Sequence, residues 1–317
     1  MTRLAILDDY QDVALRMADW DRLSVDVEVV VFRDHLADLD AVAARLADFD
    51  IVVAMRERTP FPRTLLERLP RLRLLVTTGM RNAAIDLQAA ADRGVLVCGT
   101  AGLPYPTAEL TWGLILALVR RIPREERAVR EGRWQETVGL GVNGKTLGVL
   151  GLGTLGSRVA RIARAFEMQV LAWSHHLTAE RAAEVGATLV GRDELLARSD
   201  VVTIHLVLSE RTRGLIGLRE LALMKPSAYL VNTSRGPIVN ETALVRALRD
   251  GAIAGAGLDV FDEEPLPPDH PFRRLPNTVV TPHLGYVTEE TYRIFYGQAL
   301  EDITAYLRGQ PIRVLHP

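Results

Sequence analysis

Residues 146–166, TLGVLGLGTLGSRVARIARAF, decide the fold of this chain. Residues 146–150 form a short apolar run with the composition of a buried parallel strand. From residue 159 to residue 166, apolar side chains recur at helical spacing. Between the two lies Gly151-Leu152-Gly153-Thr154-Leu155-Gly156. The stretch therefore predicts a strand that leads into a helix through a glycine-rich turn.

This turn has the glycine spacing of a dinucleotide site. Gly151 allows a tight turn, Gly153 lets the backbone approach a pyrophosphate, and Gly156 lets helix and strand pack closely. The first N–H groups of the helix would then face the phosphates. The same spacing alone also occurs in ordinary glycine-rich turns, so the interpretation depends on the flanking strand and helix.

Length and composition restrict the function further. The chain has 317 residues, which suggests about two domains. A net charge of -2, from 38 basic and 40 acidic residues, gives no overall field for nucleic acid or an anionic membrane. The single cysteine, Cys98, lies in an apolar run and fits a protein core in a reducing compartment. No signal peptide or membrane span is expected, and the sequence predicts a soluble cytoplasmic protein that acts on small molecules.

Strand and helix patterns alternate on both sides of the glycine turn. The pattern predicts a parallel α/β domain before it, with strands at 4–7, 27–32, 51–55, 72–77 and 95–98, and helices at 36–47, 63–69 and 87–93. A second sheet is predicted around the turn, with further strands at 169–173, 201–206, 228–232, 255–258 and 278–281, and helices at 195–198, 218–224 and 241–249. A final helix, residues 288–308, is expected to pack back on the first domain.

Two helical segments precede the glycine turn. Residues 107–122 are apolar and residues 124–133 carry charges of both signs. The charged segment is interpreted as a helix that faces solvent or a second subunit, with nucleic-acid binding as the alternative.

Four motifs carry a resemblance to a known family. They are GKTLGVLGLGTLG at 144–156, VNTSRGPIVNETAL at 231–244, GLDVFDEEPLP at 257–267 and TPHLGY at 281–286. Together with Thr107-Ala108-Glu109, this ordered set resembles the D-isomer-specific 2-hydroxyacid dehydrogenase family over nearly the whole chain.

The resemblance implies a fold of class α/β with two doubly wound parallel-sheet domains. A Rossmann cofactor domain, residues 100–285, would be inserted in a flavodoxin-like substrate domain formed by residues 1–99 and 286–317. The resemblance also implies a nicotinamide cofactor, NAD(P), and commonly a homodimer that forms through the cofactor domain.

Three residues match the family's catalytic positions. Reducing a 2-oxo acid requires a hydride, a cation for the carboxylate and carbonyl, and an acid for the new alkoxide. Arg235 follows a strand, Glu264 precedes Pro265, and His283 stands in TPHLG. Taken alone, Arg235 could be a surface arginine, His283 a structural histidine, and Glu264 part of an exposed acidic turn. Formate dehydrogenases of the superfamily usually have glutamine at the position of Glu264, so a glutamate indicates a carbonyl substrate that needs a proton.

The remaining candidates bind cofactor or substrate. The glycine turn and the resemblance together assign the cofactor to Thr107, Gly151, Gly153, Thr154, Leu155, Gly156, Ser174, His175, His205, Thr233 and Asp259. Gly79, Met80 and Arg81, together with Arg235, are expected to contact the substrate. Residues 78–86, TGMRNAAID, depart from the family's GxGxDNID loop, so the larger side chains should reshape that pocket, although Arg81 could instead pair with a surface acid.

Ser174 governs the expected choice of cofactor. It lies 18 residues after Gly156, where NAD-specific sites place an Asp or Glu for the ribose 2′-OH. Without that carboxylate a 2′-phosphate is not repelled, and a protonated His175 or His176 could bind it. No arginine follows at once, Arg181 being the nearest downstream, so a modest preference for NADPH is predicted.

The sequence thus predicts an oxidoreductase that transfers a hydride between NAD(P)H and a 2-oxo acid or D-2-hydroxy acid, with acids of the glyoxylate or hydroxypyruvate type as candidate substrates. The alternative is a nicotinamide-sensing, corepressor-like interaction protein, because such proteins share this fold. No metal site is expected.

Overall fold

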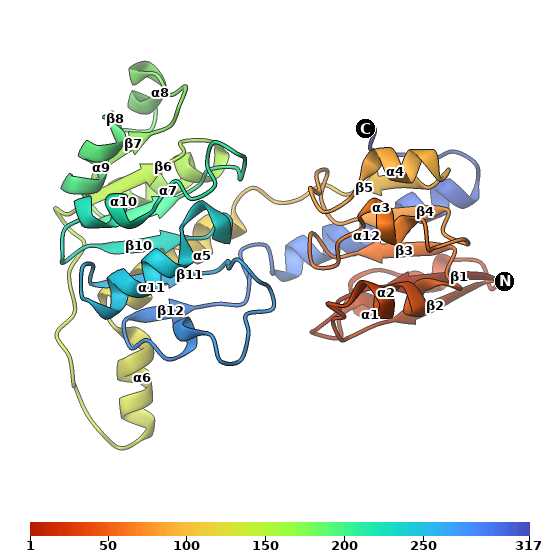
Figure 1. The fold of residues 1–317 in the computed structure, drawn as a ribbon, viewed down its shortest axis with the longest axis horizontal. Helices are drawn as coiled ribbons and strands as arrows, with labels where there is room; N and C mark the ends of the chain where they lie inside the picture. Colours follow the sequence, from red (N-terminus) through yellow and green to blue (C-terminus); the bar gives the residue numbers. More distant parts are fainter. The chain divides into compact units, whose positions relative to one another are not determined.

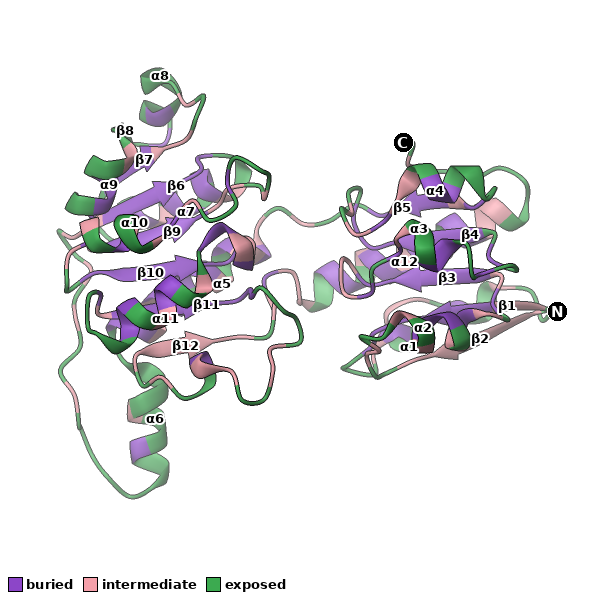
Figure 2. Ribbon diagram, in the orientation of Figure 1, coloured by how far each residue is buried: buried purple, intermediate pink, exposed green.

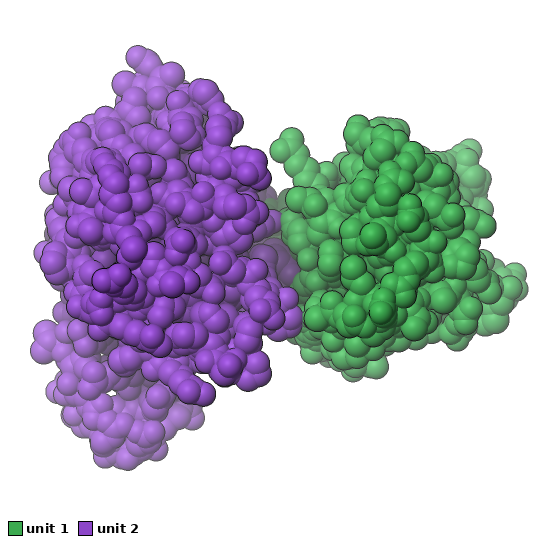
Figure 3. All heavy atoms as spheres, in the orientation of Figure 1, with its two compact units in different colours: residues 1–103, 288–317 green, residues 104–287 purple.

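The computed structural model describes residues 1–317, and the chain divides into two compact units. One comprises Met1–Leu103 and Thr288–Pro317, and the other Pro104–Val287 (Figure 3). The first boundary was expected after residue 99, four residues before the observed one at 103. The second was expected after residue 285, two residues before the observed one at 287. Residues 100 and 101 stay with the first unit because the Thr100 hydroxyl accepts a hydrogen bond from Gly79 N at 2.9 Å and Ala101 N donates to Gln298 at 2.7 Å.

The first unit contains a parallel sheet in the order β2-β1-β3-β4-β5 (Figure 1). Its strands are β1 Thr2–Ile6, β2 Val27–Val31, β3 Ile51–Ala54, β4 Leu74–Thr77 and β5 Leu96–Gly99. Every residue of β3 and β4 is buried, as expected for central strands of a parallel sheet covered on both faces.

Helices cover both faces of this sheet. They are α1 Ala14–Met17, α2 Leu39–Leu46, α3 Arg63–Leu66, α4 Leu87–Asp92 and α12 Glu289–Leu307, with a 3₁₀ turn η1 at Trp20–Arg22. Apolar side chains of α2, α3 and α4 share one core cluster with the strands. The C-terminal helix α12 packs on β4, β5 and α1, as the sequence predicted. The Cys98 thiol is buried in β5, and burial raises its pKa to about 12, in line with a core role.

The second unit contains a parallel sheet in the order β12-β11-β10-β9-β6-β7-β8. Its strands are β6 Thr146–Leu150, β7 Gln169–Trp173, β8 Thr188–Leu189, β9 Val201–Ile204, β10 Tyr229–Asn232, β11 Gly255–Leu258 and β12 Thr278–Val280. Because β6 pairs with both β7 and β9, the chain direction across the sheet reverses at β6. Ligands bind doubly wound sheets outside the carboxyl ends of the strands at such a point.

Helices again cover both faces of the second sheet (Figure 2). The longer helices are α5 Pro106–Val119, α6 Ile122–Arg130, α7 Thr154–Ala165, α9 Arg192–Arg198, α10 Leu218–Leu223 and α11 Glu241–Arg249. One core cluster contains residues of α5 and α7, and the other contains residues of α9, α10 and α11. The two parallel sheets confirm the predicted α/β class.

Several elements, such as α2, α3 and β9, are shorter than predicted, and the structure differs from the predicted elements in three other places. The strand β8 and the short helices α1 and α8 (Ala179–Ala183) carry too few residues for a visible periodicity. The helix expected at 107–122 ends at Val119 because Arg121 takes a left-handed conformation, with φ at 55°. The charged helix then begins at Ile122, with Pro123 in its first turn, two residues earlier than predicted.

No helix of the chain has the length and apolar composition needed to cross a bilayer.

Candidate active site

The glycine turn lies between β6 and α7, where the sheet reverses direction. Gly151 has φ at 95°, and a Cβ there would lie 2.6 Å from the carbonyl oxygen of His205. A Cβ at Gly156 would overlap the carbonyl group of Gly151, whereas the space beside Gly153 is open. No side chain caps α7, so the N–H groups of its first turn, which contains Thr154 and Leu155, face outward from the helix end. This cradle fits a pyrophosphate, because backbone donors and a helix dipole point at a space that side chains do not fill.

Ser174 follows β7 directly, next to an aromatic and cationic cluster. The His175 ring lies 5.0 Å from the ring of Trp173, the last residue of β7. The Arg192 guanidinium lies 5.9 Å from the same Trp173 ring and 3.2 Å from a Glu220 oxygen. Arg181, the arginine nearest in sequence, pairs with Glu184 instead. The structure thus brings Arg192 close to the Ser174 turn.

His205 follows β9 and is neutral. Its Nε2 lies 3.0 Å from the Thr203 hydroxyl, and its Nδ1 is buried without a hydrogen-bond partner. Burial lowers the pKa of the imidazole to about 4. A buried polar atom without a partner next to the glycine turn fits a site that a ligand completes.

Arg235 projects from a turn that Asn232 organises. Asn232, at the end of β10, is buried, and its amide donates to Arg235 O at 2.9 Å and accepts from Ser234 N at 3.0 Å. The next residue, Gly236, packs so closely that a Cβ there would overlap the carbonyl group of Phe261. The Arg235 turn is therefore fixed against the start of the loop that carries Glu264.

Glu264 and His283 form a hydrogen-bonded pair. Nδ1 of His283 lies 2.6 Å from one Glu264 oxygen, and the other oxygen accepts from Phe261 N at 2.9 Å. Both side chains keep partial exposure, 22% for His283 and 33% for Glu264. Because the carboxylate only accepts, Nδ1 of His283 carries a proton and Nε2 remains for other chemistry.

Asp259 holds the turn that carries His283. Its buried carboxylate accepts from the Thr281 hydroxyl at 2.6 Å, Leu284 N at 2.7 Å and Gly285 N at 2.8 Å. Burial raises the pKa of the Asp259 carboxyl, and these hydrogen bonds act in the opposite direction. All hydrogen bonds of the Asp259 carboxylate go to the His283 turn, so the aspartate expected beside the cofactor also stabilises this turn.

Two threonines of the predicted cofactor set extend this network. The Thr107 hydroxyl donates to Gly285 O at 2.8 Å, and the Thr233 hydroxyl lies 2.8 Å from that of Thr111. Thr111 also donates to Thr107 O at 2.7 Å. The start of α5 thus connects the carboxyl end of β10 to the His283 turn.

The candidate substrate loop belongs to the other unit and follows β4. Gly79 has φ at 110°, and a Cβ there would overlap the guanidinium of Arg56. Met80 and Arg81 are exposed, and Arg81 forms no ion pair in the structure, which does not favour the alternative of a surface pair.

Comparisons with known proteins place the chain in a family. The model for the NAD binding domain of D-isomer specific 2-hydroxyacid dehydrogenases matches residues 112–285. Glyoxylate reductase of Aeropyrum pernix is 43% identical over 78% of this chain and 76% of its own length. The chain belongs to the D-isomer specific 2-hydroxyacid dehydrogenase family.

Further relatives agree with this family membership. Hydroxypyruvate reductase of Blautia hydrogenotrophica is 31% identical over 94% of this chain and 95% of its own length. Among solved structures, a putative D-3-phosphoglycerate dehydrogenase from Ralstonia solanacearum superposes with a TM-score of 0.94 at 39% identity, over 100% of this chain and 97% of that one.

Family membership settles the reaction class. This dehydrogenase is an oxidoreductase that uses a nicotinamide cofactor and transfers a hydride between it and a 2-oxo or 2-hydroxy acid. The corepressor-like alternative is not supported, because the relatives are named as reductases and dehydrogenases.

Sequence reasoning missed several residues that lie next to the candidate site residues. Arg56 packs over Gly79 and donates to Thr78 O at 3.1 Å, and Arg58 lies 4.4 Å from the Tyr10 ring. Two arginines directly after the buried strand β3 were a visible signal, since the carboxyl ends of parallel strands gather at one edge. Arg192 gave no such signal, because it reaches Trp173 only through the packing of α9 on the sheet.

Proposed function

We propose that this dehydrogenase reduces a small 2-oxo acid of the glyoxylate or hydroxypyruvate type with NAD(P)H, and that Arg235, Glu264 and His283 carry the reaction. The names of its relatives support the substrate class. The observation that carries the proposal is the 2.6 Å contact between Nδ1 of His283 and Glu264, on a loop packed against the Arg235 turn.

His283 is the proton donor in this proposal. Glu264 binds the proton on Nδ1 and its negative charge balances the imidazolium, so Nε2 presents the proton that the new alkoxide receives. In the reverse direction Nε2 accepts the proton of the hydroxyl group. The partial exposure of both side chains lets the proton be replaced from solvent.

Arg235 orients the substrate. Its planar guanidinium can hold a carboxylate through two parallel hydrogen bonds and polarise the neighbouring carbonyl. When bound, the reduced nicotinamide supplies the hydride to the carbonyl carbon. The fixed Arg235 turn limits the orientations that the substrate can take, which favours catalysis by positioning.

The substrate loop of the first unit is proposed to set the choice of substrate. Gly79 has a backbone conformation that favours glycine, with its own N–H bound to the Thr100 hydroxyl, and Met80 and Arg81 replace the small residues usual in the family. Both side chains are exposed, and Arg81 would add a positive charge beside the substrate.

A modest preference for NADPH is also proposed. Ser174 lacks the carboxylate that would repel a 2′-phosphate, and His175 and Arg192 both lie against Trp173, beside it. Glu220 shares Arg192 and reduces the positive charge available there, so the preference is expected to be small.

A homodimer is proposed through α6 and the segment that follows it, which we name the arm (residues 122–145). In Figure 1 the arm extends away from the sheet, and Ala128 is the one buried residue of α6. The arm exposes Ile122, Val129, Trp134 and Val138. Such a set of exposed apolar side chains is typical of an interface.

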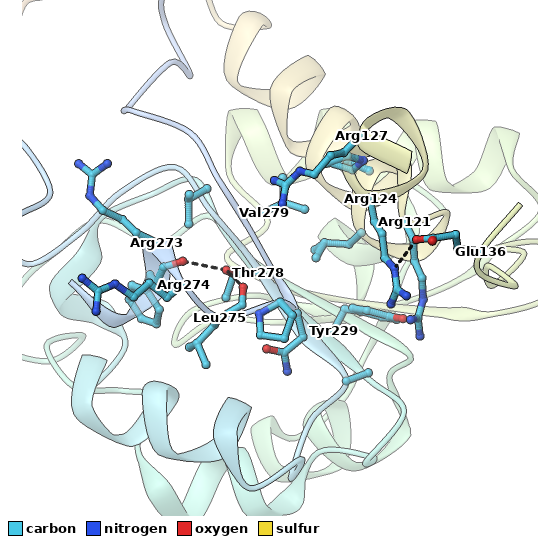
Figure 4. Close-up of a pocket in the computed structure, with 18 of the residues that line it drawn as sticks. Arg121, Arg124, Arg127, Glu136, Tyr229, Arg273, Arg274, Leu275, Thr278 and Val279 are labelled. Carbon is cyan, nitrogen blue, oxygen red and sulfur yellow. Dashed lines mark hydrogen bonds and ion pairs between the residues drawn. The ribbon is translucent and has the colours of Figure 1, made fainter. Parts of the chain in front are cut away.

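The cavity beside the arm supports the same proposal. It measures about 720 Å³ and separates α6 from β12 and the turn η3, Pro271–Arg273 (Figure 4). Its charged lining consists of Arg121, Arg124, Arg127, Arg133, Arg273, Arg274 and Glu136. Glu126 and Glu131 already pair with Arg130 and Arg133 within the arm, so the excess of arginine in the lining is proposed to meet acidic groups of a second copy. Sedimentation of the wild type and of Trp134→Asp tests the dimer, which the variant should weaken.

The single buried cysteine fits the cytoplasmic location expected from the sequence.

A spectrophotometric assay tests the proposed function. Oxidation of NADPH and NADH is followed with glyoxylate, hydroxypyruvate, pyruvate and bulkier 2-oxo acids. Glyoxylate or hydroxypyruvate is expected to give the highest kcat/KM. A clear preference for a bulky 2-oxo acid would overturn the substrate class, and no turnover of any of them would overturn the proposal.

A further inference from the structure

Both ends of the loop that carries Glu264 are bound by one carboxylate. Glu241 is the first residue of α11, and one of its oxygens accepts from Asp262 N at 3.2 Å. Its other oxygen lies 2.8 Å from Nε2 of His270. Glu264 lies between these two contact points, so Glu241 closes the loop across its base.

The contact between His270 and Glu241 has a defined proton position. Nδ1 of His270 accepts from Phe272 N at 3.3 Å, so the proton of the neutral ring is on Nε2 and is donated to Glu241. The His270 ring also lies 4.9 Å from the ring of buried Phe272, whose ring lies 6.4 Å from that of Phe261. The loop end is therefore fixed by packing as well as by a hydrogen bond.

Glu241 stands on a rigid base. The Asn240 side chain caps α11 by accepting from Ala243 N at 2.9 Å, and Leu244 and Leu248 bury the helix in the core. The positive end of the helix dipole favours a carboxylate at this first position. Glu241 is 21% exposed and His270 15%, so their contact is screened less than an ion pair at the surface.

The position of Glu241 has an electrostatic cost. Burial raises the pKa of the Asp262 carboxyl, and the negative charge of Glu241 raises it further. Arg213 and His270 act in the opposite direction and lower this pKa. A like charge beside Asp262 is unfavourable, so the backbone contact at Asp262 has to compensate for it.

Between the two ends, the Glu264 oxygens accept from Phe261 N and His283, and its side chain is 33% exposed. Arg273 supports the middle of the loop by donating to Leu266 O at 2.5 Å and Pro267 O at 2.8 Å. The place of the Glu264 carboxylate is consequently set by the path of residues 262–270, whose two ends Glu241 holds.

We propose that Glu241 is a positioning residue of the active site: together with His270 it holds the Glu264 loop so that Glu264 meets Nδ1 of His283. The inference rests on the roles proposed above for Glu264 and His283. Loss of the Glu241 carboxylate lets the loop shift, and a shift of about 1 Å in a catalytic pair is enough for a loss of about 10²-fold.

The first test compares Glu241→Ala with Arg246→Ala, which breaks the exposed Arg246 and Asp250 pair on the same helix. Glu241→Ala should lower kcat about 10- to 100-fold, and Arg246→Ala should leave it within about twofold. Binding of NADPH, followed by fluorescence, and the Tm should be similar in both variants. Glu241→Gln keeps an acceptor for Asp262 N and should recover part of the activity. Equal kcat in the two alanine variants would overturn the proposal.

A double-mutant cycle separates positioning from a general loss of structure. In the Glu264→Gln background, Glu241→Ala should have little further effect on kcat, because it acts through Glu264. Additive losses would overturn the proposal. If Glu241→Ala fails to fold, His270→Asn tests the same contact from the His270 side. An asparagine can still accept from Phe272 N but is too short to reach Glu241.

The outcomes also distinguish this inference from the proposed function. An inactive Glu264→Gln with a fully active Glu241→Ala rejects the positioning role alone. A fully active Glu264→Gln rejects the catalytic role of Glu264, and the positioning role with it.

Discussion

Nδ1 of His283 lies 2.6 Å from Glu264, and His283 itself has a left-handed backbone, with φ at 54°. This conformation costs a residue other than glycine about 1–3 kcal/mol. Asp259 holds it in place, because its carboxylate accepts the N–H groups of Leu284 and Gly285, the next two residues. The residue whose ring must meet Glu264 is thus held in a strained backbone conformation.

His283→Ala is expected to remove the proton donor. We expect kcat to fall about 10²- to 10⁴-fold, the usual contribution of a positioned acid. The NADPH dissociation constant, measured by fluorescence, should stay within about twofold of the wild type, since the glycine cradle is formed by other residues. His316→Ala, at an exposed histidine near the C-terminus, is the control. A His283→Ala enzyme with normal kcat would refute the assignment.

Arg235→Lys should not act as a conservative change. An ammonium cannot form the two parallel hydrogen bonds that a guanidinium makes with a carboxylate, so kcat/KM should fall by about 10-fold or more. Steady-state kinetics with glyoxylate measure the effect, and Arg246→Lys on the surface of α11 is the matched control. Near-normal kcat/KM for Arg235→Lys would mean that Arg235 does not hold the substrate carboxylate.

Arg81→Ala should change the choice of substrate more than the overall rate. The side chain is exposed on the substrate loop and makes no ion pair, so its removal changes the charge of the pocket without breaking a structural contact. Values of kcat/KM for glyoxylate, hydroxypyruvate and a bulkier 2-oxo acid are compared with those of Arg93→Ala, an exposed arginine at the end of α4. An unchanged ranking would show that this loop position is not selective.

Ser174→Asp should shift preference from NADPH to NADH. An aspartate accepts hydrogen bonds from the ribose 2′-OH and repels a 2′-phosphate. The measurement is kcat/KM for both cofactors on one substrate. A wild type that strongly prefers NADH, or an aspartate variant that still uses NADPH well, would contradict this view of the turn.

Asp302→Asn should flatten the pH dependence of stability. Burial raises the pKa of the Asp302 carboxyl to about 7, although Arg313 Nε lies 2.9 Å away and acts against the shift. In the unfolded chain an aspartate has a pKa of about 3.9. The folded state therefore binds more protons between about pH 4 and 7, and the free energy of unfolding falls as pH rises through that window.

The amide introduced by Asp302→Asn has no proton to release, so the Tm of this variant should change less between about pH 4 and 7 than that of the wild type. Thermal unfolding across this range measures the difference, with Glu301→Gln, an exposed neighbour that also pairs with Arg313, as the control. Parallel curves for Asp302→Asn and the wild type would contradict the assignment.

Much of the fold could be predicted because its signals are local. Strands β6, β7 and β11 have the predicted ends, since short apolar runs mark them clearly. The strand β8, with two residues, and the break at Arg121 could not be seen, because neither interrupts a periodicity long enough to measure. The candidate residues Arg235, Glu264 and His283 came from short motifs, and the structure places Glu264 and His283 in contact.

The sequence by itself determined the order of most elements and the glycine cradle, because strand and helix periods and turn residues act over a few neighbouring positions, and its motifs indicated the catalytic candidates through their resemblance to the family. Only the tertiary structure decided which distant side chains meet. Arg192 reaches Trp173, and Glu241 reaches both Asp262 and His270, through the packing of helices on the carboxyl ends of parallel strands. Such contacts join residues about 20 to 30 positions apart, and their geometry depends on how the sheet brings its strand ends together, which no local pattern encodes.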